Sequence, residues 1–273
     1  MSRPMNSHAS SPAGPVEVVD AGGVRTITVN RPGAHNSLDR ELRLGLIDAF
    51  TAAADQSAAG GDVRVVVLRA EGRAFCTGQD LKEQLEDSRR GTGTRKVVDE
   101  YNPMTAALLS VPVPVIAAVQ GPAAGAGWGL AMACDLRVAS SEASFKAAFS
   151  GVGLASDCGL SRSLADAVGQ TKALELLLLD EKIPASRAAE LGIVTSVVEP
   201  ERLDGAVEEL ARRFAAGPTA SYREIKALVR DTGAVTDRAG EEADAQARLF
   251  TTQDHVEAMA AFLEKRTPRF TGH

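Results

Sequence analysis

The sequence predicts an α/β core followed by a helical region in the C-terminal third of the chain. Three observations support this prediction. Short, continuous apolar segments alternate with segments of helical periodicity up to about residue 159. Two glycine-rich turns each follow a strand segment and precede a helix segment. Beyond Gly159 the strand signals fade, and helical periodicity continues almost to the C-terminus.

The first part of the chain provides the expected strands. Segments 16–20 and 24–30, separated by Gly22-Gly23, predict a hairpin of short strands. A helix is expected from about Asn36 to Ala54, where apolar residues recur at helical spacing. Further expected elements are strands over 63–69, 113–119, 136–139 and 144–147, and helices over 97–110 and 127–133. The polar segment 82–95 is the best candidate for a mobile loop.

The C-terminal part is predicted to be largely helical. Its expected helices cover 161–168, 172–179, 185–191, 203–216, 219–229 and 237–263. We therefore divide the chain into a disordered tail over 1–14, a core over 15–200 and a helical C-terminal region over 201–273.

Composition excludes several classes of protein. A net charge of −6, without a strong cluster of Lys and Arg, argues against a nucleic-acid-binding protein. Cys76, Cys134 and Cys158 are widely spaced and odd in number, which predicts neither disulfides nor a metal site and indicates a reducing compartment. The N-terminus does not resemble a secretory signal. Prolines and glycines interrupt the most apolar stretch, 111–139, so we expect no membrane span and a cytoplasmic protein.

The two glycine-rich turns, 72–81 and 120–129, are the first candidates for a functional site. Glycines let backbone N–H groups approach a ligand, and the start of a helix adds unpaired N–H donors. Two such turns facing one another could direct two N–H groups at a single carbonyl oxygen and stabilise an oxyanion. The second turn, with Gly125, Gly127 and Gly129, lacks the GxGxxG spacing of a dinucleotide site, so a dehydrogenase is only a remote alternative.

The motifs together resemble the crotonase (enoyl-CoA hydratase/isomerase) superfamily over about residues 16–270. They are Gly-Arg-Ala-Phe-Cys-x-Gly-x-Asp-Leu at 72–81, Pro-Val-Ile-Ala-Ala-Val at 114–119 leading into Gly-x-Ala-x-Gly-x-Gly, Leu-Ala-Met-Ala-Cys-Asp-Leu at 130–136, and Phe-Leu-Glu-Lys-Arg at 262–266. The resemblance implies a spiral of ββα units with a helical C-terminal region that makes trimerisation and CoA contacts. It also implies a homotrimer or a dimer of trimers that acts on a small-molecule acyl-CoA.

Site residues follow from the resemblance by position. The N–H groups of Gln79 and Ala126 would form the oxyanion hole. Residues expected to bind the substrate or its CoA are Ala74, Gln79, Asp80, Leu81, Gly125, Phe262 and Lys265. The tail residues Phe262 and Lys265 would reach the CoA of a neighbouring subunit, although Lys265 also fits a solvated helix charge. Asp80 is also expected to cap the following helix, and Asp135 to cap or brace a strand.

Hydratases of this family usually carry two glutamates around the substrate. Here the corresponding positions are Gly129 and the stretch Ala148-Phe149, so both carboxylates are missing. The remaining acid is Asp157, in a turn that resembles that of the isomerases acting on ring-1,2-epoxyphenylacetyl-CoA, where this aspartate is the acid/base. Ser156 and Leu160 depart from that pattern, because Pro and Gly are usual there.

The leading interpretation is an acyl-CoA thioester isomerase in which Asp157 moves a proton through an enolate. An enoyl-CoA hydratase with an altered acid/base set remains open, as does a non-catalytic acyl-CoA-binding protein in which Asp157 is a plain turn residue. No histidine motif supports a thiol nucleophile at Cys76 or Cys158. We expect no metal and no cofactor beyond the CoA of the substrate.

Overall fold

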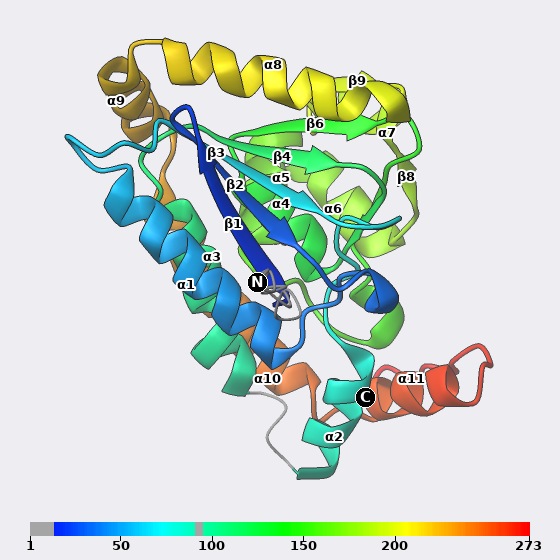
Figure 1. Ribbon diagram of the computed structural model, residues 1–273. Coiled ribbons are helices and arrows are strands. Elements are labelled where there is room, and N and C mark those ends of the chain that lie inside the picture. The colour runs from blue at the N-terminus through cyan, green and yellow to red at the C-terminus, as the bar shows by residue number, and fades with distance from the viewer. Residues whose placement is uncertain (1–13, 91–94) are drawn as a thin grey trace, which may run out of the picture.

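A computed structural model describes residues 14–90 and 95–273 of the chain (Figure 1). The chain begins with the predicted hairpin, strands β1 (Val16–Ala21) and β2 (Val24–Val29), which pair antiparallel. The expected tail over 1–14 lies almost wholly outside the described residues.

Two sheets are present in the described part of the chain. The larger has six strands in the order β1-β2-β3-β4-β6-β9, and every pair after the first is parallel. Its further strands are β3 (Val65–Ala70), β4 (Val115–Val119), β6 (Leu136–Ser140) and β9 (Ser196–Val198). The smaller sheet consists of β5 (Pro122–Ala124), β7 (Ser144–Lys146) and β8 (Ile183–Pro184).

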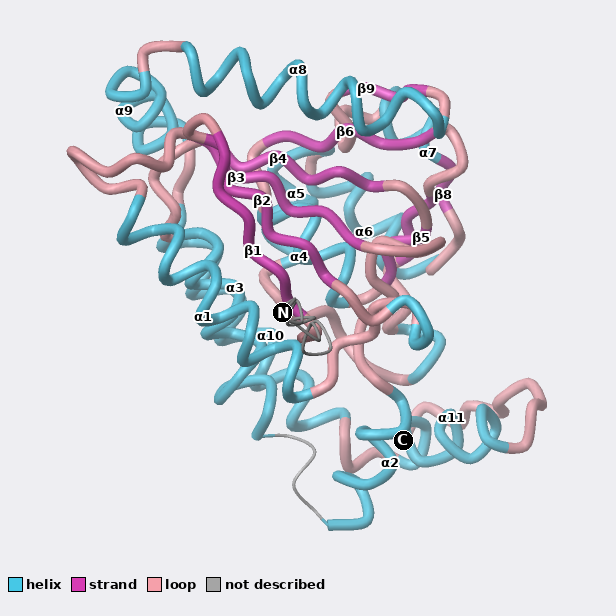
Figure 2. The backbone as a smooth tube through the Cα atoms, viewed as in Figure 1, coloured by secondary structure: helices cyan, strands magenta, loops and turns pink. Residues whose placement is uncertain are grey.

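Helices cover both faces of the larger sheet (Figure 2). On one face, α8 (Leu203–Ala216) packs against alternate residues of the central strands, including Val65 and Val67. On the other face, Val66 and Leu68 join the main core. This core also includes α1 (Arg40–Gln56), α3 (Asn102–Leu109) and α4 (Ala126–Ala133). Strands buried on both faces explain the continuous apolar segments of the sequence.

Six further α-helices lie in the second half of the described chain, where helices were predicted. They are α5 (Leu160–Val168), α6 (Gln170–Leu179), α7 (Ala185–Glu190), α9 (Thr219–Val229), α10 (Thr232–Leu249) and α11 (Gln253–Leu263). Short helical turns cover Pro32–Ala34, Val97–Tyr101, Ser150–Val152 and Pro200–Arg202. The single helix expected over 237–263 was wrong, because the chain breaks after α10 and Thr252 caps α11 by accepting from the N–H of His255.

The prediction of a loop over 82–95 was wrong for most of its length. Helix α2 (Leu81–Arg90) occupies this segment, and residues 91–94 lie outside the described residues. Asp80 starts the helix by accepting from the N–H groups of Lys82 at 3.0 Å and Glu83 at 3.3 Å. Arg43 of α1 then anchors its first turn through an ion pair with Glu83 at 2.6 Å. A polar helix is stabilised here by a cap and a buried ion pair.

In the described part of the chain, no helix has the length and apolar character needed to cross a membrane.

Candidate active site

The two glycine-rich turns lie against each other. Cys76 of the first turn forms a bridge with Ala123, and the N–H of Ala124 donates to the Cys76 carbonyl at 2.9 Å. A Cβ atom on Gly78 would lie 2.8 Å from the carbonyl oxygen of Ala124 and 3.3 Å from the nitrogen of Ala126. Gly78 also has a φ of +83°. Only glycine therefore allows this approach of the two backbones.

The N–H groups of Gln79 and Ala126 are both unused at this junction. Leu38 pairs with the residues on either side of Gln79, because its N–H donates to Gly78 and its carbonyl accepts from Asp80. Ala126 is the first residue of α4, so its N–H has no partner within the helix. Neither N–H donates to an acceptor in the described part of the chain. The predicted oxyanion-hole donors are therefore available in adjoining turns.

Asp157 lies in the turn that precedes α5, and it is only 5% exposed. Its Oδ1 atom is buried and has no hydrogen-bond partner in the described part of the chain. Burial, together with the charge of Glu242, raises the pKa of Asp157 to about 7, while a hydrogen bond with Cys158 acts in the opposite direction. Asp157 is thus not a solvated turn residue.

The turn of Asp157 packs directly on α4. A Cβ atom on Gly129 would lie 2.7 Å from the Cβ of Cys158 and 3.5 Å from the carbonyl oxygen of Asp157. Because α4 begins at Ala126, this contact places the turn one helical turn from that predicted oxyanion-hole donor. The same contact leaves no room for a side chain at position 129, where hydratases of the resembled family usually carry a glutamate.

Hydrophobic residues occupy the position of the other missing glutamate. Phe149 is buried, and its ring lies near Gly125, where an added Cβ atom would be 3.9 Å from the phenyl Cζ. Trp128 is fully buried and contacts Phe145, with 5.9 Å between ring centroids. The surroundings of the second glycine-rich turn are therefore apolar.

Two thiols and a phenol lie near Asp157 but are poor candidates for catalysis. Burial raises the pKa of Cys76 to about 12, and the negative charge of Asp157 contributes to the increase. Burial also raises the pKa values of Cys158 and Tyr101 well above their usual ranges. A thiol in this state is not a thiolate nucleophile near neutral pH.

Sequence reasoning missed a second buried carboxylate, that of Glu242 in α10. It is 4% exposed and accepts hydrogen bonds from the Oγ of Ser156 at 2.8 Å and from the N–H groups of Gly159 and Ser161 at 2.7 and 2.8 Å. The sequence offered one indication that Glu242 is buried, because it lies at helical spacing with the other residues on the buried face of α10. The buried residues of this face are Val235, Ala239, Glu242, Ala243 and Gln246.

The backbone expected to bind CoA lies around the first turn. The carbonyl of Ala74 accepts from Asn36 at 2.7 Å and from Gln120 at 2.9 Å, so it is occupied by the protein. The carboxylate of Asp80 accepts from Ser37 at 3.0 Å and Arg31 at 3.2 Å in addition to capping α2. A contact with CoA at Ala74 would therefore have to come from its backbone N–H group. At Asp80 the backbone N–H also has a partner, because it donates to the carbonyl of Leu38 at 3.3 Å.

Leu81 and Gly125 complete this group. Leu81 is partly exposed at the start of α2. Gly125 directly precedes α4, and its N–H donates to the carbonyl of Lys146 at 3.1 Å.

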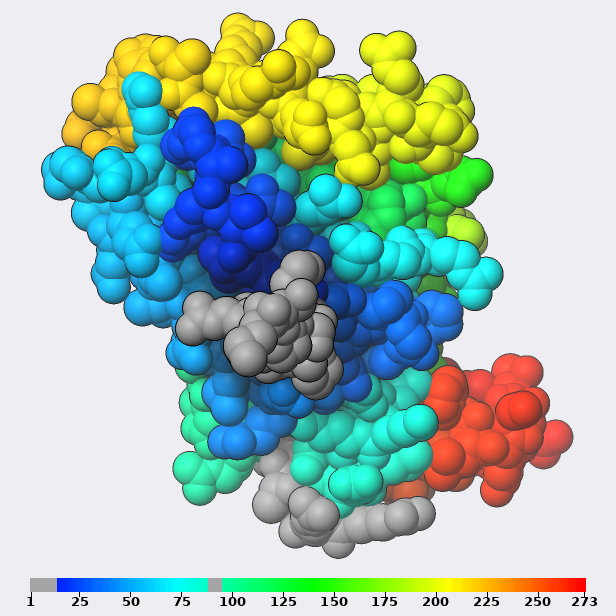
Figure 3. Space-filling model, viewed as in Figure 1, coloured from blue at the N-terminus to red at the C-terminus, as the bar shows by residue number. Residues whose placement is uncertain are grey.

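The structure does not bring the tail residues to these turns within one chain. Phe262 lies on α11 and is 51% exposed, and Lys265 follows the end of this helix. Figure 3 shows that the C-terminal segment protrudes from the body of the molecule. A contact of Phe262 and Lys265 with the CoA of a neighbouring subunit stays a prediction.

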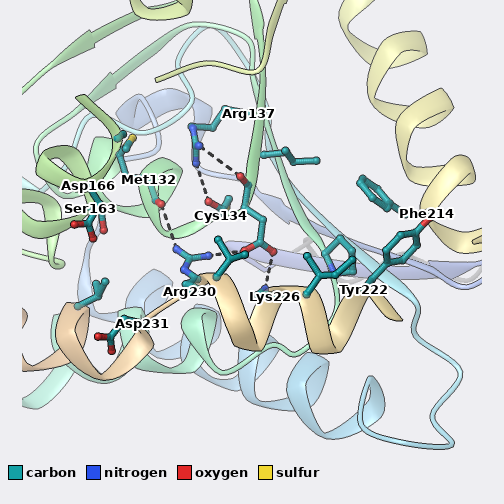
Figure 4. A pocket seen from close by; sticks show the side chains of 17 residues that line it. Met132, Cys134, Arg137, Ser163, Asp166, Phe214, Tyr222, Lys226, Arg230 and Asp231 are labelled. Carbon is teal, nitrogen blue, oxygen red and sulfur yellow. Dashed lines mark hydrogen bonds and ion pairs between the residues drawn. The ribbon is translucent and has the colours of Figure 1, made fainter. Parts of the chain in front are cut away.

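A separate hollow of about 520 Å³ lies between α4, α5 and α9 (Figure 4). Lys226 of α9 and Arg230, which directly follows this helix, converge there on Asp135, with N–O distances of 2.6 Å in both ion pairs. Asp135 also accepts from the N–H of Val115 at 2.8 Å, so it braces β4 as expected. The residues lining this hollow do not include Gln79, Ala126 or Asp157.

Among the described residues, no group of three or more His, Cys, Asp or Glu side chains could hold a metal ion. The chemistry available at the two turns is instead that of two free N–H donors and one buried carboxyl group.

Comparisons with known proteins give a consistent family for the chain. The family model described as enoyl-CoA hydratase/isomerase matches residues 20–273. The chain is 36% identical over 257 residues to 1,2-epoxyphenylacetyl-CoA isomerase of Escherichia coli K12, covering 92% of this chain and 95% of the relative. It is 37% identical over 253 residues to a protein of Rhodobacter capsulatus named "Probable enoyl-CoA hydratase", with the same coverage. The crystal structure of an enoyl-CoA hydratase from Mycobacterium avium subsp. paratuberculosis has a TM-score of 0.83 at 35% identity, covering 95% of this chain and all of that one.

Proposed function

Because the chain belongs to the enoyl-CoA hydratase/isomerase (crotonase) family, we propose that it is an enoyl-CoA isomerase with Asp157 as its acid/base. The observation that carries this proposal is the buried Asp157 carboxyl group, which has an unpaired oxygen and a pKa of about 7. A carboxyl group with this pKa can both accept and return a proton near neutral pH.

The reaction needs one carboxyl group and one oxyanion hole. Asp157, in its ionised form, takes a proton from C2 of a 3-enoyl-CoA. The C2–H bond breaks, an O–H bond forms on Asp157, and the negative charge spreads to the thioester oxygen. The N–H groups of Gln79 and Ala126 would hold this oxygen. Asp157 then protonates C4, which moves the double bond to C2–C3 without a change in mass.

The surroundings of Asp157 favour isomerisation over hydration. Hydration needs a positioned water molecule, and hydratases of this family commonly use two glutamates to position it. Gly129 is packed against Cys158, and Phe149 is apolar, so neither position offers a carboxylate. Glu242, the other buried acid near the turn, already accepts three hydrogen bonds from it. Because the similar protein of R. capsulatus is named a probable enoyl-CoA hydratase, hydration is the alternative that the experiment must test.

We further propose that the substrate is an acyl-CoA and that no cofactor is needed beyond the CoA which the substrate carries. We also propose a homotrimer or a dimer of trimers. The apolar residues exposed on α11, namely Val256, Phe262 and Leu263, support a subunit contact at this helix.

The decisive experiment incubates the purified protein with matched 3-enoyl-CoA and 2-enoyl-CoA and follows the products by chromatography with mass detection. We expect a shifted double bond at unchanged mass. Asp157→Asn should lower turnover by about 10²-fold to 10⁴-fold. Asp166→Asn, at an exposed ion pair on α5, is the control and should leave turnover unchanged.

Other outcomes would replace the proposal. A gain of one water would establish a hydratase. Unchanged turnover in Asp157→Asn would remove this residue from the mechanism. Acyl-CoA binding without turnover in the unaltered protein would indicate a binding protein.

A further inference from the structure

Glu242 connects α10 to the turn that carries Asp157. One of its oxygens, Oε1, accepts from the hydroxyl of Ser156 and from the N–H of Ser161, both at 2.8 Å. The other, Oε2, accepts from the N–H of Gly159 at 2.7 Å. All three partners donate, which is the pattern that an ionised carboxylate requires.

These donors lie on both sides of Asp157 along the chain. Ser156 directly precedes it, while Gly159 and Ser161 follow it at the start of α5. One helical turn beyond Glu242, the side chain of Gln246 donates to the carbonyl of Ala155 at 2.8 Å. The backbone from 155 to 161 is therefore held by two neighbouring side chains of a single helix.

The same helix also limits the turn by packing. Gly159 has a φ of +68°, and a Cβ atom there would lie 2.5 Å from the Cγ1 of Val235. Cys158 meets Gly129 of α4 on the other side. The turn is thus enclosed between α4 and α10, and Glu242 supplies its polar attachment.

We propose that Glu242 is a positioning residue for Asp157, which fixes the turn through three hydrogen bonds and places a second carboxylate beside the acid/base. This inference rests on the proposed function. It assigns a role to a residue outside the two glycine-rich turns. It also gives a specific partner to Ser156, which stands where the resembled isomerases usually have proline.

The charge of Glu242 has a defined effect on the chemistry of Asp157. The titratable groups that act on Asp157 are Glu242 of α10 and Cys158 of its own turn, and Asp157 in turn acts on Cys76 of the first glycine-rich turn and Tyr101 before α3. None of these four is a cation. Burial raises the pKa of Asp157 above its usual value, and Glu242 raises this pKa further because like charges disfavour ionisation.

The test compares Glu242→Gln with Glu241→Gln, the same substitution one residue earlier on α10. Glu241 is exposed and pairs with Arg238 at 2.8 Å. We expect Glu242→Gln to lower kcat by about 100-fold through misplacement of Asp157, with KM nearly unchanged. The acid limb of the kcat–pH profile should shift to lower pH, because the like charge is gone. Glu241→Gln should match the unaltered protein in both respects.

A measurement without turnover separates this inference from the proposed function. In protein with ¹³C-labelled aspartate, the Asp157 carboxyl resonance is assigned by its loss in Asp157→Asn and then titrated by NMR. Its midpoint should fall in Glu242→Gln and stay constant in Glu241→Gln. If Asp157→Asn retains full turnover while this shift occurs, the proposed function fails and the electrostatic coupling stands.

Two results would overturn the inference. One is a Glu242→Gln protein with the kcat and pH profile of Glu241→Gln, while Asp157→Asn is inactive. The other is an unchanged kcat in Ser156→Ala, the variant to use if Glu242→Gln does not fold. Ser156→Ala then removes one of the three hydrogen bonds without altering the charge, and we expect about a 10-fold lower kcat with an unshifted pH profile. Unchanged kcat in Ser156→Ala would contradict the positioning role.

Discussion

The carboxyl group of Asp157 is buried beside another carboxylate, and this environment sets the pH range in which it can act as a base. Its pKa of about 7 lies above the usual value for aspartate. Asp157 is therefore mostly protonated below this pH and mostly ionised above it. We expect kcat for isomerisation to fall by about tenfold for each pH unit below this value, because only the ionised form takes up the proton.

The measurement is a kcat–pH profile with a 3-enoyl-CoA. It covers roughly two pH units on either side of the pKa of Asp157, from about pH 5 to about pH 9. The residual rate of Asp157→Asn serves as the control and should lack the acid limb. A flat profile in the unaltered protein would contradict the assignment of Asp157 as the base.

Gly129 supplies a second prediction at the level of single residues. A methyl group there would lie 2.7 Å from the Cβ of Cys158, so Gly129→Ala should lower the free energy of unfolding by about 1–3 kcal/mol through overpacking. It should also displace the turn and reduce kcat.

The control for Gly129 is Gly205→Ala on α8, where an added Cβ atom meets nothing within 4 Å. This variant should be more stable by about 0.5–1 kcal/mol, because alanine favours the helix. Urea denaturation of both variants provides the comparison. Equal effects of the two substitutions would show that the contact between Gly129 and Cys158 is not tight.

Single residues of the site were predictable where a backbone motif marked them. Gln79, Ala126 and Asp157 were assigned by position from motifs that resemble the crotonase family, whereas no motif marks Glu242. It lies more than eighty residues along the chain from its partners, and one more acid in a charged helix looks like a solvated side chain. Only packing of α10 against the turn makes it a buried acceptor.

Among the elements, α2 depends on a buried cation more than on its own sequence. Arg43 is 1% exposed at its side chain and pairs with both Glu83 and Glu100 at 2.6 Å. Arg43→Met would remove the most buried cationic partner of both carboxylates, leaving Glu100 with Arg40 at 3.1 Å and Glu83 with Lys96 at 4.0 Å. We expect the free energy of unfolding to fall by about 3 kcal/mol.

Arg187→Met is the matched control, because it breaks an exposed pair with Glu190 on α7 and should cost less than about 1 kcal/mol. Chemical denaturation with circular dichroism measures both. A loss at Arg43 no larger than that at Arg187 would show that α2 does not need this anchor.

Each element that could not be predicted from the sequence has its own physical explanation. β5, β8 and β9 contain only two or three residues each, which is too short for an alternating pattern to appear. α2 is polar, so it lacks the apolar periodicity that identified α1 and α8. The break between α10 and α11 depends on the Thr252 cap, which periodicity alone does not register.

At the scale of the whole molecule, the chain segment of α11, which carries Phe262 and precedes Lys265, protrudes from the body. If the proposed assembly brings them to a neighbouring CoA, Lys265→Ala should raise KM for acyl-CoA about fivefold at low salt and leave kcat unchanged. The effect should weaken as salt is added, since it depends on charge.

Lys172→Ala, on α6, is a suitable control because its ammonium group pairs with Glu175 within the same helix. Sedimentation should give the mass of three or six chains for all of these proteins. A monomer with unchanged KM in Lys265→Ala would contradict both the assembly and the tail contact.

The attachment of the Asp157 turn to α10 also has a consequence for biosynthesis. A ribosome completes the strands of the larger sheet, up to Val198, well before it reaches Glu242. A nascent chain stalled between these points would already have every strand of that sheet, yet its acid/base turn would lack the side chains that hold it. Enzymatic activity would then arise only after the C-terminal helices emerge and dock. Prematurely terminated chains would therefore have no activity rather than weak activity.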